Sequence, residues 1–279
     1  MRRRVGMVVA AAIAAVLAVA GCGEEKESGE EAAADPVRVV VIGNVPADEP
    51  ARSDPCPGCD PWWAQFTDHV SSELGTEATY DVVSVDGVPE ALDAVSQPGP
   101  EADKVAAADV VVISVGANNA LPDPETGIGC KAWFLDAHGP CLAEGVKTYG
   151  DLYDQVYAAV KALRDDKPTV YVQTTSTNGN ISPPSEVSDG LLSLYTDAGR
   201  EDEAKAWAVA AYDRWSTMQT ERATAAGFQV IDTYHALNGP DGTEDLVPEF
   251  NKDDHFNAAG HDRFAAQLAD VDLSVLSDR

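Results

Sequence analysis

The feature that most constrains the fold is a regular alternation between short apolar runs and longer segments of helical periodicity. Five runs rich in β-branched residues lack polar alternation, which is typical of strands covered on both faces. They are residues 37–42, 80–85, 110–115, 169–175 and 228–231. Segments with apolar residues at helical spacing lie between them, at residues 62–74, 89–107 (interrupted at Pro98 and Pro100), 149–163 and 202–226. This alternation predicts an α/β domain with a flavodoxin-like parallel sheet of about five strands in the order 2-1-3-4-5, and with helices on both faces.

The N-terminus carries the pattern of an export signal. Three arginines at residues 2–4 precede an apolar run at residues 5–20, which is shorter and more abruptly ended than a membrane span. The run closes on Leu17-Ala18-Val19-Ala20-Gly21-Cys22, and small residues directly before a cysteine resemble a bacterial lipobox. That resemblance implies that residues 1–21 are a lipoprotein signal peptide and that Cys22 carries a lipid anchored in the bacterial cell membrane. An ordinary secretory signal or an uncleaved anchor are the alternatives, and each places the domain outside the cytoplasm.

The next segment and the net charge narrow the range of partners. Residues 22–35 are rich in Glu, Gly, Ser and Ala, and we expect a disordered acidic tether there. Residues 36–279 are enough for one large domain. The formal net charge is −28 at pH 7, a field that repels nucleic acid and anionic lipid surfaces. We therefore expect no nucleic-acid partner, and membrane contact through the N-terminal lipid only. Separately, we expect no cofactor, no metal and a monomer.

Two short blocks in the predicted domain resemble those of a known family. The third predicted strand ends in Val115-Gly116-Ala117-Asn118-Asn119. A last helix, with apolar residues at Phe256, Ala259, Phe264 and Leu268, is predicted to begin directly after His255 in the block Asp253-Asp254-His255-Phe256-Asn257-Ala258-Ala259-Gly260. These blocks resemble the third block (Gly-x-Asn-Asp) and the last block of the SGNH/GDSL hydrolases, which are esterases and lipases. The resemblance implies a three-layer α/β/α sandwich and ester hydrolysis by Ser, His and Asp. It assigns His255 as the base and Asn118 and Gly87 as oxyanion-hole donors.

The residues themselves suit this chemistry. His255 would lie on a loop that leads into a helix, where a catalytic base is free to point into a cleft. Asn118 comes two residues after a glycine that permits a tight turn out of the strand, and its amide hydrogens can stabilise an oxyanion. The alternative is that His255 is a surface residue and that Asp254 or Asn257 caps the helix.

The first and last blocks also depart from the family pattern. The family's Gly-Asp-Ser should end the first strand, where this chain has Gly43-Asn44-Val45-Pro46. Either Val45 replaces the serine or one residue is deleted, and in both cases the nucleophilic hydroxyl is absent. We keep Asn44 as a substrate-binding residue. The aspartate three residues before the histidine is replaced by Lys252, so we assign Asp253 to orient His255, with Asp254 as the alternative.

Four further cysteines fit an exported chain. Cys56, Cys59, Cys130 and Cys141 allow three pairings, of which we favour the local pairs Cys56–Cys59 and Cys130–Cys141. A zinc site built from the same four thiolates is the alternative. Disulfides are favoured because the compartment is oxidising and because the chain has no second Cys-x-x-Cys motif.

Two function classes follow from these observations. The first is an extracytoplasmic lipoprotein whose esterase-like domain is weakly active or inactive and binds a glycan, a lipid or a surface partner. The second is an active carboxylic-ester hydrolase that uses His255 with a water or an unrecognised nucleophile. In both classes the ligand is expected to be an acylated carbohydrate or a lipid ester.

Overall fold

The computed structural model of the chain describes residues 35–43, 58–116, 140–165, 167–177, 201–246 and 256–277. All of them belong to one compact unit that spans residues 34–279. The expected signal peptide and nearly all of the expected tether lie outside the described residues and stay predictions.

The five predicted strands form one parallel sheet. They are β1 (Val37–Gly43), β2 (Ala78–Ser84), β3 (Val110–Ser114), β4 (Val170–Thr174) and β5 (Gln229–Ile231). The sheet order is β2-β1-β3-β4-β5, and every neighbouring pair is parallel. The predicted strand order and the parallel sheet are therefore confirmed.

Helices connect the strands, as the periodicity predicts. They are α1 (Trp62–Leu74), α2 (Val88–Ser96), α3 (Pro100–Ala107), α4 (Pro140–Arg164), α6 (Glu201–Ala226), α7 (Thr233–Asn238) and α8 (Ala258–Leu268), with a final 3₁₀ turn at Ser274–Leu276. Two details differ from expectation. Helix α4 begins well before residue 149. The sequence did not predict these first turns because Gly145 and Gly150 weaken their apolar pattern. Helix α7 was not predicted, because it is too short to show a helical period.

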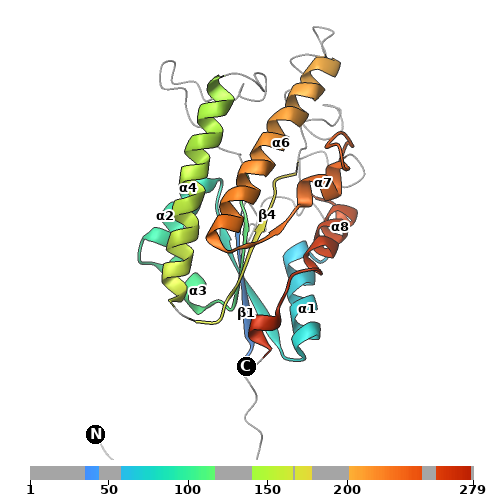
Figure 1. Cartoon of the computed structure of the whole chain (residues 1–279). Coiled ribbons are helices and arrows are strands. Elements are labelled where there is room, and N and C mark those ends of the chain that lie inside the picture. Colours follow the sequence, from blue (N-terminus) through green and yellow to red (C-terminus); the bar gives the residue numbers. More distant parts are fainter. Residues whose placement is uncertain are drawn as a thin grey trace, which may run out of the picture. The chain divides into compact units, whose positions relative to one another are not determined.

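The helices cover both faces of the sheet, so the predicted three-layer arrangement is confirmed (Figure 1). Successive residues of β1 point alternately into two apolar cores. Val40 and Ile42 pack in the core beneath α2, α3, α4 and α6. Val39 and Val41 pack in the core beneath α1, α7 and α8. All four side chains are fully buried. This two-sided burial explains why the central strands β1 and β3 consist mainly of valine and isoleucine.

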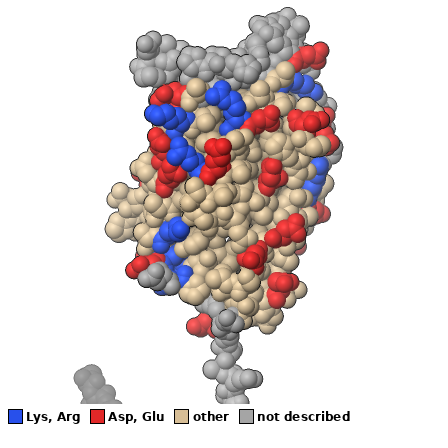
Figure 2. Space-filling view, in the orientation of Figure 1, with Lys and Arg blue, Asp and Glu red and all other residues tan. Residues whose placement is uncertain are grey.

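Charged side chains lie outside these cores. Figure 2 shows acidic and basic residues interspersed over α4 and α6, beside a broad uncharged area. Arg222 of α6 forms ion pairs with Asp151 and Asp154 of α4, which link the two helices across their exposed groove. Among the described residues, no helix has both the length and the apolar character that a bilayer-spanning segment needs.

Candidate functional site

The carboxyl edge of a parallel sheet is where ligand sites of α/β proteins lie, and the predicted site residues follow strand ends. Because all five strands are parallel, the segments that leave them meet at this edge. Residues 85–87 follow β2, residues 115–116 follow β3, residues 175–177 follow β4 and residues 232–233 follow β5. This edge also receives the N-terminus of α2, whose first backbone N–H groups have no partner within the helix. Such an edge suits the binding of a polar or anionic group.

The end of β1 is held closely between its two neighbours. Gly43 pairs with Ser84 of β2 and with Ser114 of β3, and its carbonyl accepts a hydrogen bond of 2.9 Å from the backbone N–H of Val85. A Cβ atom at position 43 would lie 2.5 Å from the carbonyl oxygen of Ser114. Only glycine fits there. Its position is thus fixed between the two neighbouring strands, and the chain continues from it to Asn44 and Val45. Both of those residues lie outside the described residues.

Gly87 lies where the sequence places it, beside the end of β1. It is two residues beyond Val85, whose N–H is bound to Gly43, and it is the N-cap of α2 in an extended conformation. Its carbonyl accepts the first hydrogen bond of that helix, from Ala91 at 3.0 Å. Its role as an oxyanion donor stays a prediction.

The other predicted site residues fall on segments that are not described. Asn118, Asp253 and His255 lie there, and so does Asp254. Their convergence with Gly87 therefore stays a prediction. The described neighbour Asn257 is the N-cap of α8, and its side chain accepts a hydrogen bond of 3.0 Å from Gly260. The capping role that we considered for Asn257 is thus confirmed.

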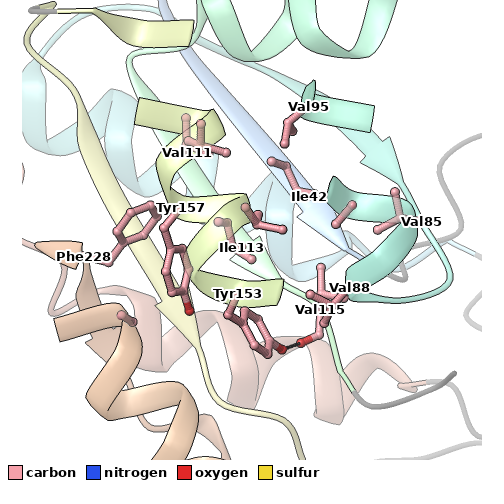
Figure 3. Close-up of a cluster of buried hydrophobic side chains, with 14 of the residues drawn as sticks. Ile42, Val85, Val88, Val95, Val111, Ile113, Val115, Tyr153, Tyr157 and Phe228 are labelled. Carbon is pink, nitrogen blue, oxygen red and sulfur yellow. Dashed lines mark hydrogen bonds between the residues drawn. The ribbon is translucent and has the colours of Figure 1, made fainter. Parts of the chain in front are cut away.

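A buried polar cluster below the exits of β3 and β4 was not predicted. Gln219 of α6 is fully buried, and its amide donates to the hydroxyl of Tyr153 at 2.8 Å and to the carbonyl of Val115 at 3.3 Å. Tyr153 of α4 also donates to that carbonyl, at 2.5 Å (Figure 3). Burial raises the pKa of the Tyr153 hydroxyl, although its hydrogen bond with Gln219 acts in the opposite direction. A single glutamine in a long helix gives no sequence signal of such a cluster.

A second polar group joins the ends of β4 and β5. The hydroxyl of Thr175 donates to Asp232 at 3.0 Å and accepts a hydrogen bond of 2.9 Å from the backbone N–H of Tyr234. Asp232 caps α7, and its other carboxylate oxygen lies 2.6 Å from Nδ1 of His235. These groups satisfy one another within the fold, so we assign them a structural role.

The tryptophan pair Trp62 and Trp63 belongs to the core. Both are buried against α8, and the Trp62 and Phe264 rings are 4.7 Å apart. Although tryptophan side chains often stack on sugars, the burial of this pair leaves it no face for a ligand. The histidine beside them, His261, was not singled out by the sequence.

The cysteine predictions remain untested. Cys59 lies shortly before α1, but Cys22, Cys56 and Cys130 and the side chain of Cys141 are outside the described residues. Both the disulfide pairs and the zinc alternative therefore stay predictions. Across the described part of the chain, no group of three or more His, Cys, Asp or Glu side chains is placed to hold a metal ion.

Comparison with known proteins supports the fold and identifies the family. The sequence model of the GDSL-like lipase/acylhydrolase family matches residues 34–263. No curated protein sequence matches the chain. Among solved structures, similar folds include a lipase from a goat rumen metagenome (14% identity, TM-score 0.52, covering 85% of this chain and 99% of that chain). An extracellular lipase from Streptomyces rimosus is similar over 85% of this chain and 100% of that chain, with 16% identity and a TM-score of 0.51. A mutant acetyl-xylooligosaccharide esterase from Geobacillus matches over 84% and 93%, with 15% identity and a TM-score of 0.51.

Proposed function

We propose, given that this chain belongs to the GDSL-like lipase/acylhydrolase family, that it is an exported lipoprotein which binds an acylated carbohydrate or a lipid ester with little or no turnover. The ligand would lie at the carboxyl edge of the sheet, beside Gly43 and Gly87. The lipid on Cys22 would hold the domain at the outer face of the bacterial cell membrane, where such esters are exposed.

The observation that carries this proposal is the end of β1. The strand ends at Gly43, and the next three residues are Asn44, Val45 and Pro46, none of which has a hydroxyl group. The only hydroxyl between Gly43 and the start of α1 belongs to Ser53, ten residues beyond the strand. Hydrolysis through an acyl-enzyme needs a nucleophile at this elbow, and a backbone amide cannot serve as one.

The retained residues can still recognise an ester, and the missing hydroxyl disfavours its cleavage. Asn118 and Gly87 are the proposed donors to the ester carbonyl, with Asn44 beside them. His255 remains, but Lys252 stands where the family has the aspartate that orients the histidine, which leaves Asp253 as the candidate for that role. The ligand class follows the family, since its relatives of known structure include lipases and an acetyl-xylooligosaccharide esterase.

A test of turnover uses the purified domain, residues 36–279, with a fluorophosphonate probe and an aryl acetate. We expect no labelling and only background hydrolysis, which His255→Ala leaves unchanged. Val45→Ser is the complementary variant, because a restored hydroxyl beside His255 should react with the probe. Labelling of the unmodified domain would contradict the proposal.

A test of binding uses calorimetry with acetylated xylo-oligosaccharides, and with the deacetylated oligosaccharides as the matched control. We expect the acetylated form to bind more tightly and Asn118→Ala to reduce that preference, because it removes a donor to the ester carbonyl. Equal binding of the two forms would show that the site does not recognise an ester.

The second candidate function is active ester hydrolysis with His255 and a water or an unrecognised nucleophile. The presence of both Asn118 and His255 favours it, since these residues would stabilise and deprotonate the reacting groups. Robust hydrolysis by the unmodified domain that His255→Ala abolishes would establish this function in place of the first.

The proposed location has its own test. Metabolic labelling with a fatty-acid analogue should modify the intact chain, and Cys22→Ala should abolish the label and release the protein from the membrane fraction. Labelling that persists in Cys22→Ala would contradict the anchor. Size-exclusion chromatography of the released protein should give a monomer.

A further inference from the structure

We propose that Gln219 is a positioning residue that holds the exits of β3 and β4 in the geometry needed for ligand binding. The inference rests on the proposed function, because it assumes that a ligand binds at the carboxyl edge of the sheet. Gln219 lies in α6, outside all of the family-like blocks, and would be an additional residue that supports the site.

One side-chain amide joins two strand exits and two helices. From α6, the Gln219 nitrogen donates to the carbonyl of Val115 and to the hydroxyl of Tyr153 of α4. The Gln219 oxygen accepts from the backbone N–H of Ser176 at 3.1 Å and from its hydroxyl at 3.4 Å. Both ends of the amide are therefore used, and each end faces a different strand exit.

The two strand exits need such a link because the sheet no longer pairs them. The last backbone pair between β3 and β4 joins Ile113 and Gln173. Val115 and Ser176 lie beyond that pair, where buried backbone groups still require hydrogen-bond partners. Gln219 and Tyr153 provide these partners in place of a strand.

This link bears directly on the site. Val115 immediately precedes the Gly116-Ala117-Asn118-Asn119 block that carries the proposed oxyanion donor. A displacement of the Val115 carbonyl would shift the start of that block. Displacements of about 1 Å are enough to weaken an oriented polar contact strongly.

The burial of the Gln219 amide indicates that its role is to fix the geometry of the surrounding backbone. Gln219 is fully buried in the core of α4 and α6. A buried amide is costly unless it is completely hydrogen-bonded, and an apolar side chain of the same volume would pack there without that requirement. Completely bonded polar groups of this kind specify one arrangement of the surrounding backbone.

The chain contains a matched control pair. Tyr157 follows Tyr153 by one turn of α4, and their rings are stacked with centroids 5.8 Å apart. The hydroxyl of Tyr157 donates to the side chain of Gln173 at 2.9 Å, and Gln173 is also fully buried. Figure 3 shows Tyr153 beside Val115, and Tyr157 beside Phe228. Gln173 also donates to the carbonyl of Thr174 in β4 at 2.6 Å. The control pair is thus a buried Tyr–Gln hydrogen bond that, among the described residues, has no hydrogen bond to the exit of β3.

The first measurement is binding of acetylated xylo-oligosaccharide by calorimetry, combined with urea unfolding of each variant. We expect Gln219→Met and Gln173→Met to lower the unfolding midpoint to a similar extent. Only Gln219→Met should weaken binding, by about tenfold, since this corresponds to the loss of about one well-formed polar contact. Tyr153→Phe should weaken binding as well, whereas Tyr157→Phe should not.

The second measurement needs no ligand. Hydrogen exchange at the amide of Gly116 should accelerate in Gln219→Met and in Tyr153→Phe, relative to the two control variants. If the unmodified domain fails to bind the ester, the proposed function fails, and the exchange rates still decide the role of Gln219. Equal exchange in Gln219→Met and Gln173→Met would overturn the inference, and so would unchanged affinity in Gln219→Met when the unmodified domain binds.

Discussion

The backbone N–H of Trp62 donates to Nδ1 of His261 at 3.3 Å, joining two helices across 199 residues of sequence. Trp62 is the first residue of α1, and the N-cap of that helix, Pro61, makes no side-chain hydrogen bond. The imidazole of α8 therefore supplies the cap that α1 lacks in its own sequence. The position of α1 on the sheet thus depends on the helix that follows the last family-like block.

We expect His261→Ala to lower the free energy of unfolding by about 2 kcal/mol, since it removes a helix cap and the packing of a buried ring. The ring contacts Trp63 and Phe256, whose centroids lie 5.8 and 5.7 Å away. Urea unfolding measures the loss, and His261→Asn, which keeps an acceptor, should recover part of it. Equal stability of His261→Ala and the unmodified domain would show that the bond has no capping effect.

We expect Asp109→Ala to destabilise the domain by about 3–5 kcal/mol, because it leaves Arg164 buried without its carboxylate. Asp109 accepts a hydrogen bond of 2.9 Å from the backbone N–H of Arg38 and lies 3.6 Å from the Arg164 guanidinium. The matched control is Arg222→Met in α6, which removes the exposed ion pairs with two aspartates of α4 and should cost less than about 1 kcal/mol. Thermal or urea unfolding measures both losses. Similar losses in the two variants would show that burial does not determine the contribution of an ion pair to stability here.

We expect Gly43→Ala to destabilise the domain by about 2–3 kcal/mol, since its Cβ would overlap the Ser114 carbonyl and force β1 away from β3. The control is Gly145→Ala in α4, where a Cβ meets nothing within 4 Å. That change should be neutral or stabilising by up to about 1 kcal/mol, because alanine favours the helix. The urea midpoint should therefore fall in Gly43→Ala and stay unchanged or rise in Gly145→Ala.

We expect stability to fall as the pH rises above about 10, the ordinary pKa of tyrosine. Burial, and secondarily Glu90, raises the pKa of Tyr149 to about 12. Burial also raises the pKa values of Tyr153 and Tyr157. Because the folded state binds these protons more tightly than the unfolded state, the stabilisation is complete below pH 10 and is lost toward pH 12.

The absorbance of tyrosinate at 295 nm tests this expectation. Three of the eight tyrosines should ionise only together with unfolding. Tyr149→Phe is the control, because the buried Tyr149 hydroxyl has no hydrogen-bond partner in the described structure and its removal should not destabilise the domain at pH 7. Ionisation of all eight tyrosines before unfolding would contradict the prediction.

The sequence was most informative where a pattern extends over many residues. The β-branched runs and the helical periods between them predicted the strand order, because each element buries several residues with the same spacing. The position of Gly87 followed from its place after a strand. Gln219 and His261 could not be predicted, since each acts through one contact with a distant segment and leaves no periodic signal. The short helix α7 was missed for a similar reason.

The Arg164 ion pair lies at the opposite edge of the sheet from the candidate site. Arg164 donates to the carbonyl of Ala106 at 2.7 Å and to the hydroxyl of Thr169 at 2.9 Å, just before β3 and β4 begin. This buried ion pair is thereby remote from the residues that follow β1. Beyond Gly43, substitutions in the first block therefore leave this ion pair intact. Under the proposed function, such substitutions exchange catalysis for binding while the descendants of the lineage keep the ancestral architecture.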